Sequence, residues 1–496
     1  MIEVRLTNTG LREQRHRAGE PVRCGVPLPR GWCDGARAWL RVQAHDGTQR
    51  ASQTRIIKRW PDGSARWVLV DWLLSEEDGG QFELYKGDAP PADENWYRRS
   101  GDDLTVVTRN ARYRLTAGAT FPVVSIEGCR WPRPMRPNLS LSFASANTPV
   151  TIRCEALQLI DAGPVCLTVK ARAQIAAPGK APLVCVVRLT FYRESAAVGA
   201  TVALTNPNAA EHPGGIWELG DSGSVLLREF SFNVATDGQA RGAQLRLGEN
   251  DAVLHHGSRL GVHQESSGGE RWDSPNHLNR NAQLTLRYRG FKAVAGEAVT
   301  AGNRAQPVLQ LNGAQEARFA LAARYFWQNF PRGLHFEDGG ARLALFPADC
   351  ADAHELQGGE RKTHEWWWAV DADEPYSLAW VADPAVLHVA TDWIESAKAV
   401  PYIKRGVFDE SYRFYLDRMI AGDESFEAKR ERIDEYGWRN FGDINADHEA
   451  AFHTSEEPYI SHYNNQYDAV YSFGAHFLCS GDIPIAIENA NIEYLY

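Results

Sequence analysis

The 496-residue sequence has no long apolar run and no excess of positive charge. The absence of any window of about 18 apolar residues argues against a membrane-spanning helix. Lys and Arg number 53 against 63 Asp and Glu, which gives a formal net charge of -10. Because a nucleic-acid-binding protein needs a basic face, we expect neither a membrane nor a nucleic acid as a partner.

The sequence also lacks a secretion signal and any CxxC pair. Residues 1–16, MIEVRLTNTGLREQRH, have no apolar central region and resemble the start of a strand. Several of the eight cysteines lie in apolar, strand-like runs such as LVCVVRL. This pattern predicts reduced, buried thiols in a cytoplasmic protein, with no metal site of the structural zinc type.

Aromatic residues are plentiful by contrast. The chain has 16 Trp, three of them consecutive at 366–368. Trp and Tyr present flat apolar faces with a polar group, which suits sugar rings as well as protein cores. The composition of 44% hydrophobic and 23% charged residues is typical of soluble globular proteins, and the length predicts two or three domains.

Short strand-like segments separated by turn residues dominate the first 400 residues. In residues 1–95, Pro61-Asp62-Gly63 predicts a tight hairpin, and 88–94 resembles a linker. Residues 96–400 continue the alternating pattern, which predicts large antiparallel sheets in a β-sandwich. Residues 401–496 change to helical spacing. The sequence therefore predicts a mainly β, multidomain protein that ends in a helical segment.

Two helices are predicted in that last segment. FDESYRFYLDRMI, residues 408–420, aligns its apolar residues along one stripe. A second helix is predicted to end at Ser480-Gly481-Asp482. Its predicted apolar face consists of Tyr467, Val470, Tyr471, Gly474, Phe477 and Leu478.

The segment before this second helix is the main candidate site, because many polar groups converge there among aromatic residues. Its His448-Glu449 and His453 form HExxxH, which is not the HExxH spacing of a helical zinc site. Asp443 and Glu449 could form a glycosidase carboxylate pair. His462 and Tyr463 could form a proton-transfer pair; alternatively, His462 or Asn464 caps the helix.

A second candidate lies at residues 354–365. On a strand, the spacing of Glu360, Lys362 and His364 puts all three side chains on one face. A carboxylate, an ammonium and an imidazole together suit acid–base chemistry or anion binding. The alternative is an outer sheet face covered by salt bridges.

Two long polar loops interrupt the predicted sandwich, at 206–223 and 263–281. The first leads into GDSGS at 220–224, which we interpret as a turn and not as a protease motif. The second has one Trp among polar residues, which suits sugar contact and equally an ordinary surface loop.

Several motifs, taken in order along the chain, resemble the exo-rhamnogalacturonan lyases and their uncharacterised bacterial relatives, often labelled as Tat-pathway signal proteins. The motifs are GVPLPRG (25–31), RWPDGSARWVLVDW (59–72), GGIWELGDSGS (214–224), SSGGERWDSPNHLNRN (266–281), YFWQNFPRGL (325–334), ELQGGERKTHE (355–365), YGWRNFGDINADHEA (436–450) and SHYNNQYD (461–468).

The resemblance implies a small β-barrel at 1–95, a β-sandwich at 96–400 and the start of an (α/α) toroid at 401–496. Family members continue well beyond SHYNNQYD, so we expect the toroid to be truncated here. The implied activity is cleavage of the rhamnogalacturonan backbone of pectin by β-elimination at galacturonate. The implied partner is an acidic polysaccharide or oligosaccharide, and a calcium requirement is left open.

β-Elimination needs a group that neutralises the uronate carboxylate, a base for the C5 proton and an acid for the leaving oxygen. We assign Arg439 and Asn464 to the carboxylate and His462 or Lys362 to the base. Tyr463 or Tyr467 would be the acid. The remaining candidate substrate-binding residues are Asn440, Gln466, His364, Glu360, Asp443 and His448.

Two other functions fit the same residues. One is a glycoside hydrolase that uses an Asp/Glu pair such as Asp443 and Glu449. The other is a non-catalytic or degenerate saccharide-binding paralogue, which a truncated toroid favours.

Overall fold

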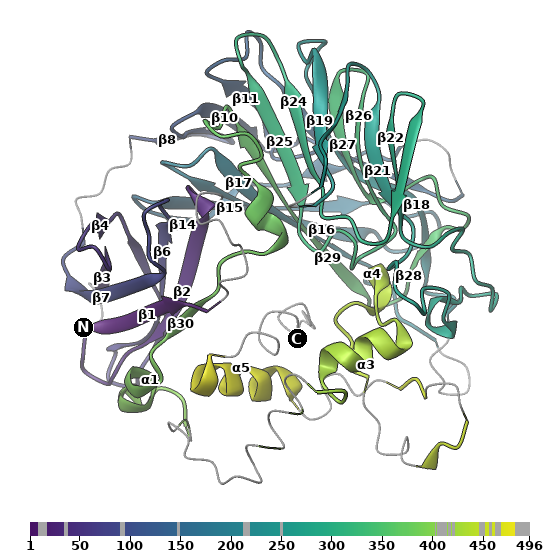
Figure 1. Ribbon diagram of the computed structural model, residues 1–496. Coiled ribbons are helices and arrows are strands. Elements are labelled where there is room, and N and C mark those ends of the chain that lie inside the picture. The colour runs from purple at the N-terminus through teal and green to yellow at the C-terminus, as the bar shows by residue number, and fades with distance from the viewer. Residues whose placement is uncertain are drawn as a thin grey trace.

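The computed structural model describes residues 1–7, 17–33, 38–89, 95–145, 149–211, 219–248, 251–401, 403, 414, 418, 422–445, 452–455, 459–461 and 468–481. These residues form five antiparallel sheets and a few short helices, so the predicted mainly β, multidomain class is confirmed (Figure 1).

Two small sheets near the N-terminus enclose one core and form a barrel. The first sheet has the order β30 (Leu387–Val389), β1 (Ile2–Leu6), β7 (Gln81–Gly87), β3 (Trp39–Ala44) and β4 (Gln49–Arg50). The second has the order β2 (Pro21–Pro27), β6 (Ala65–Leu73) and β5 (Gln53–Arg59). Leu40, Val68 and Trp72 are fully buried between them.

The hairpin predicted at Pro61-Asp62-Gly63 connects β5 to β6, which pair antiparallel. Gly63 has a φ of 87°, which favours glycine, and its amide donates to the Trp60 carbonyl at 2.9 Å. The Asp62 carboxylate accepts from the Ser64 amide at 3.0 Å. The hairpin prediction is therefore confirmed.

The edge strand β30 comes from residues 387–389, far along the chain from its partner β1. Val4 lies opposite Val389 and Leu6 opposite Leu387. The chain therefore returns to the barrel after the sandwich is complete, a pairing that no local pattern in the sequence indicates.

Three further sheets build the large antiparallel sandwich. The four-stranded sheet has the order β11 (Val123–Gly128), β10 (Ala111–Thr116), β9 (Asp103–Val107) and β8 (Tyr97–Ser100). The eight-stranded sheet has the order β12 (Arg136–Phe143), β18 (Val225–Ala235), β27 (Gly340–Phe346), β26 (Arg332–Glu337), β21 (Leu260–Gln264), β22 (Phe291–Ala295) and β23 (Ala298–Gly302), with β28 (His354–Leu356) also on β18. The ten-stranded sheet has the order β13 (Arg153–Cys154), β15 (Cys166–Ile175), β16 (Leu183–Tyr192), β17 (Ala197–Thr205), β29 (Arg361–Val370), β25 (Arg318–Ala323), β24 (Val308–Asn312), β19 (Gly242–Arg246) and β20 (Leu254–His256), with β14 (Gln158–Ala162) also on β15.

Large aromatic side chains fill the space between the two widest sheets. Phe232 on β18 lies 5.0 Å from Trp366 and 5.8 Å from Trp368 between ring centroids. Both tryptophans come from β29, and all three side chains are fully buried. Alternating residues of β29 therefore supply the core, as the period of two along a strand requires.

Gln53 connects the barrel to the sandwich. Its Oε1 accepts from the amides of Val165 and Cys166 at 3.1 and 2.9 Å, and its Nε2 donates to Asp161 at 3.1 Å. Gln53 is 2% exposed, so water cannot replace these partners.

We expect Gln53→Ala to destabilise the protein by about 1–3 kcal/mol, because two buried amides lose their acceptor. Urea unfolding followed by tryptophan fluorescence measures the change. Gln81→Ala, on an exposed position of β7, is the matched control and is expected to stay within about 0.5 kcal/mol of the parent. Equal midpoints for the two variants would contradict this role of Gln53.

The helical segments are α1 (Thr391–Ala397), α3 (Phe426–Ile433), α4 (Gly437–Asn440) and α5 (Ala469–Ser480), with 3₁₀ turns η3 (Pro275–His277) and η4 (Ala379–Ala382). Helix α5 and its end at Gly481, which has a φ of 77°, confirm the predicted helix and stop. Most of the helix predicted at 408–420 lies outside the described residues. No helix in the described ranges is both long and apolar enough to cross a bilayer.

The face of α5 that packs differs from the predicted one. Val470 and Tyr471 are exposed, whereas Phe473 is buried and lies 4.7 Å from Phe426 of α3 between ring centroids. Leu478, which was predicted on the apolar face, packs against the barrel core. The packed face is set by partners on both the barrel and α3, which helical spacing alone does not reveal.

All eight cysteines lie among the described residues, and none forms a disulfide. Cys24, Cys33, Cys154, Cys166 and Cys185 are buried. Burial raises the pKa of the Cys24 thiol to about 12, which makes it unreactive near neutral pH.

Candidate functional site

Helix α4 carries Arg439, and its entry is fixed by backbone contacts with the sandwich. The Gly437 amide donates to the Gln328 carbonyl at 2.7 Å, and the Trp438 amide donates to Phe330 at 2.8 Å. Gly437 has a φ of 91°, and a Cβ there would lie 3.2 Å from the Phe330 ring. This position therefore favours glycine for both conformation and space.

Arg439 joins α4 to the turn that precedes β29. Its Nη1 donates to Glu360 Oε1 at 2.8 Å, and its Nη2 donates to the Glu355 carbonyl. Glu360 Oε2 accepts from the Gln357 amide at 2.7 Å. The predicted sandwich face and the predicted polar segment are thus in direct contact, although 79 residues separate the two partners.

Lys362 lies two residues beyond Glu360 and is half-buried on β29. Burial, and then the nearby Arg332 guanidinium, lower the pKa of the Lys362 ammonium to about 7; Asp443 and Glu360 oppose this shift. Among the described residues, no hydrogen bond or ion pair holds the amine. About half of the Lys362 side chains therefore carry a neutral amine at pH 7, the form of a lysine that can accept a proton.

His364 lies below Lys362 in the sandwich interior. Its Nδ1 accepts from Arg332 Nη2 at 2.9 Å, and its ring lies 5.0 Å from that of Phe346. Burial first, and Arg332 second, hold the pKa of His364 well below its usual value. Lys362 and His364, two residues apart on β29, both lie beside Arg332, whereas Glu360 lies in the turn before the strand and not on it as predicted. His364 is fully buried and so has no route to a ligand in this structure.

Arg332 is itself buried, at 1% exposure, and its Nη1 donates to the carbonyls of Arg324 and Tyr325. Burial lowers the pKa of its guanidinium to about 9. No carboxylate pairs with Arg332 within the described part of the chain. Its positive charge therefore lowers the pKa of the two nearby groups, Lys362 and His364.

Asn440 and Asp443 also reach this region. Asn440 Nδ2 donates to the Asn276 carbonyl at 3.0 Å, so it holds α4 to the loop at 263–281. Asp443 interacts electrostatically with both Lys362 and Glu360. The other candidate residues lie outside the described residues: His448, Glu449, His462, Tyr463, Asn464, Gln466 and Tyr467.

Arg439 also lines a pocket of about 130 Å³, whose lining does not include Glu360 or Lys362. The loop at 276–280, the segment 350–355 and helix α4 form its walls. Trp438, Arg439 and Asn440 line it from α4, and His277 and Glu355 line it from the sandwich.

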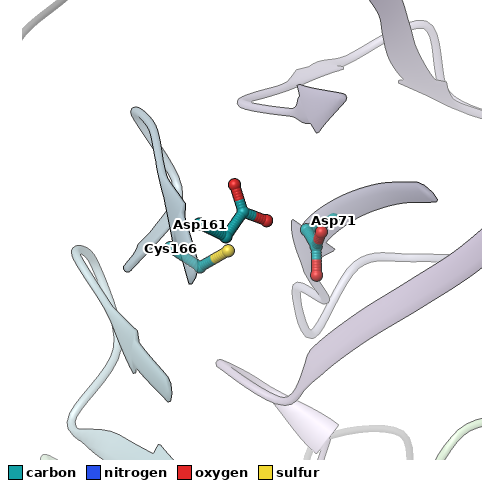
Figure 2. Close-up of side chains that lie close together, drawn as sticks. All are labelled: Asp71, Asp161 and Cys166. Carbon is teal, nitrogen blue, oxygen red and sulfur yellow. The ribbon is translucent and has the colours of Figure 1, made fainter. Parts of the chain in front are cut away.

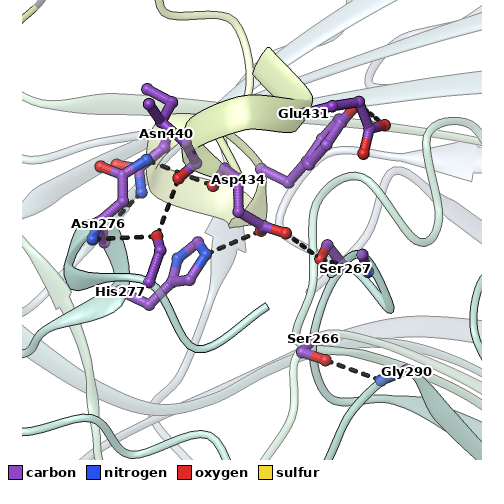
Figure 3. A network of polar contacts seen from close by, with 12 residues as sticks. Ser266, Ser267, Asn276, His277, Gly290, Glu431, Asp434 and Asn440 are labelled. Carbon is purple, nitrogen blue, oxygen red and sulfur yellow. Dashed lines mark hydrogen bonds and ion pairs between the residues drawn. The ribbon is translucent and has the colours of Figure 1, made fainter. Parts of the chain in front are cut away.

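His277 is oriented by a carboxylate, an arrangement that no sequence motif indicated. Its Nε2 donates to Asp434 Oδ1 at 2.9 Å, and Asp434 Oδ2 accepts from the Ser267 hydroxyl (Figure 3). Asp434 ends α3 with a φ of 53°, a conformation that Asp tolerates. Because 157 residues separate Asp434 from His277, no local sequence pattern predicts their contact.

The GDSGS segment forms a turn, as predicted. The Gly223 amide donates to Asp221 Oδ1 at 2.7 Å, and the Ser224 amide donates to the Asp221 carbonyl at 3.0 Å. The Ser224 hydroxyl donates to Glu355 at 2.7 Å. This segment therefore supports the pocket wall.

Asp71, Asp161 and Cys166 form a separate polar cluster between barrel and sandwich (Figure 2). One carboxylate oxygen of each Asp and the Cys166 sulfur, the atoms that could bind a metal ion, lie within 4.8 Å of one another. Each carboxylate has an arginine beside it, Arg23 at 2.7 Å from Asp71 and Arg55 at 3.1 Å from Asp161. Because these guanidinium groups already balance the two negative charges, the cluster is best interpreted as a contact between the two domains.

Among comparisons with known proteins, a family model matches the N-terminal part of the chain. Residues 6–86 match the family model described as the PcRGLX-like N-terminal RIFT barrel domain. No curated relative matches the chain.

Several solved structures align with this chain at low sequence identity and with TM-scores below 0.5. One is a glycosyl hydrolase family 38 protein from Enterococcus faecalis, with 10% identity and a TM-score of 0.45 over 78% of this chain and 47% of that one. Another is a putative aldose 1-epimerase from Klebsiella pneumoniae subsp. pneumoniae, with 11% identity and a TM-score of 0.34; the alignment covers 77% of this chain and 97% of the epimerase. The chain spans about half the length of the glycosyl hydrolase. The match at 6–86 supports, at a coarse level, the resemblance to the rhamnogalacturonan lyase-like family through a RIFT barrel at the N-terminus.

Proposed function

We propose that this chain is a carbohydrate-active protein that cleaves a rhamnogalacturonan-type backbone by β-elimination at galacturonate. The observation that carries the proposal is the position of Lys362. Its amine lies beside the Glu360–Arg439 ion pair, where the sandwich meets the helical segment, with a pKa of about 7. A base next to an arginine is what abstraction of a proton α to a carboxylate needs.

In the proposed reaction, the Lys362 amine takes the C5 proton of the galacturonosyl ring and becomes an ammonium. The C5–H electron pair forms the C4–C5 double bond, and the C4–O4 bond breaks. The leaving oxygen takes a proton and departs as an alcohol. The other product carries an unsaturated uronate at its non-reducing end.

Arg439 is proposed to neutralise the uronate carboxylate and so stabilise the enolate-like intermediate. Its contacts with Glu360 and Glu355 use two of its five N–H donors, which leaves others for a ligand. Glu360 would orient Arg439, and Asp443 would set the local potential at Lys362. Tyr463 or Tyr467 remains the proposed acid, with His462 as the alternative base.

The direct test is incubation with rhamnogalacturonan backbone oligomers, monitored for the ultraviolet absorbance of the unsaturated uronate. Its appearance supports β-elimination. Cleavage products without a double bond would instead support a glycoside hydrolase, because hydrolysis creates none. Oligomer binding without any product would support a non-catalytic saccharide-binding protein.

The proposal also predicts the pH dependence of the reaction. Lys362 acts as a base only when neutral, so kcat/KM should rise about tenfold per pH unit below pH 7 and level off above it. Initial rates from pH 5.5 to 8.5 at constant ionic strength measure this profile. A rate that is flat or falls across that range would contradict the role of Lys362.

A further inference from the structure

The pocket beside Arg439 has a charge balance that selects against an acidic ligand. Arg280 is paired with Asp352 through two contacts of 2.9 and 3.1 Å, and Arg439 is paired with Glu360. The carboxylate of Glu265, which also lines the pocket, is bound by a third arginine, Arg287. Arg280 and Arg439 on the pocket wall thus each have a carboxylate partner, and the remaining donors of Arg439 are those proposed above for the uronate beside Lys362.

Glu355 adds a negative charge that lacks such a partner. It is 4% exposed, and its Oε1 accepts from the Gly220 amide at 2.6 Å and from the Ser224 hydroxyl at 2.7 Å. Its Oε2 is buried and has no hydrogen-bond donor among the described residues. An unsatisfied buried carboxylate oxygen is costly, so a ligand hydroxyl that donates to it would gain free energy.

His277 offers a second acceptor on the same wall. Its Nε2 donates to Asp434, so in the neutral imidazole Nδ1 is the acceptor. Trp438, which is half-buried, also lines the pocket. Acceptors for hydroxyl groups combined with an aromatic side chain are the features that bind a sugar ring.

We propose that this pocket is a subsite for one neutral, hydroxylated sugar ring, with Glu355 Oε2 accepting a ring hydroxyl. Its volume of about 130 Å³ is below the several hundred Å³ of ordinary small-molecule sites, which suits a single ring. As a subsite that flanks Lys362 across Arg439, it rests on the proposed function. Its preference for a neutral ring depends only on the pocket itself.

The test compares neutral and acidic methyl glycosides by ligand-observed NMR titration. The probes are methyl α-L-rhamnopyranoside, methyl α-D-galactopyranoside and methyl α-D-galactopyranosiduronate; the last two differ only at C6, which is a hydroxymethyl group in the galactoside and a carboxylate in the uronate. We expect at least one neutral probe to bind and the uronate to bind at least about tenfold more weakly, because its charge meets an unpaired carboxylate.

Glu355→Gln keeps an acceptor at Oε1 and replaces Oε2 with a donor, so we expect neutral-probe affinity to fall at least about tenfold. Glu337→Gln, on an exposed position of β26, is the matched control and should bind like the parent. Ala353→Phe fills the pocket from its wall without altering these polar groups, and it should abolish binding.

Neutral-probe binding that survives both Glu355→Gln and Ala353→Phe would overturn the proposal, as would a uronate that binds as tightly as the neutral probes. The same titration in Lys362→Met separates the two proposals. Neutral-probe binding retained there, together with parent protein that forms no unsaturated product, would keep the subsite and reject the lyase.

Discussion

Replacing Lys362 with methionine is expected to lower formation of the unsaturated product by about 10²- to 10⁴-fold, the usual contribution of a positioned general base. The reason is that Lys362 is the described group near Arg439 with a neutral amine at neutral pH. Methionine fills similar space without the amine. The protein should still fold, because burial already disfavours the charged form of Lys362.

Product absorbance with rhamnogalacturonan oligomers measures the effect, and thermal unfolding at pH 7 checks the fold. Lys58→Met, on an exposed position of β5, controls for the loss of a surface lysine and should leave the rate unchanged. A Lys362→Met variant with more than about a tenth of the parent rate would assign the base to another residue, such as His462.

Arg439→Ala is expected to lower kcat/KM by about 10²- to 10³-fold, comparable to the loss of one donor to a developing oxyanion. The variant removes the proposed partner of the uronate carboxylate. It also leaves the carboxylate of Glu360, whose pKa burial raises, without its cation. Arg439→Lys keeps the charge but not the planar two-point geometry, so an intermediate rate is expected.

Glu360→Gln tests the orienting role of Glu360 separately from the binding of the uronate carboxylate by Arg439. It removes the carboxylate and retains Arg439, so a smaller loss than that of Arg439→Ala is expected. Arg432→Ala, which removes an arginine from the neighbouring helix α3, should not change the rate. If Arg439→Ala and Arg432→Ala had equal rates, Arg439 would have no part in the reaction.

Local patterns in the sequence predicted the strands, the β5–β6 hairpin and helix α5 with its end at Gly481, because these depend on neighbours in the chain. The spacing of Lys362 and His364 also predicted that both belong to one face of a strand, whereas Glu360, predicted on the same face, lies in the turn before β29. Their contact with Arg439 was predicted from the family resemblance, which placed both motifs in one site.

Features that depend on packing could not be predicted in this way. Arg332 lies beneath Lys362 because β26 and β29 belong to facing sheets, and nothing near either residue indicates that. The Asp434–His277 pair depends on how α3 packs against the loop at 263–281. The depth of His364, and therefore its lack of access to a ligand, follows from the same packing.

The pairing of β1 with β30 bears on how the protein is made. During synthesis, the first strand leaves the ribosome long before its neighbour at 387–389, and the whole sandwich sequence emerges in between. Until then, β1 presents an unpaired edge next to β7, the kind of edge that promotes association between chains. The barrel sheet that contains β1 therefore gains its edge strand only after residue 389 has been synthesised.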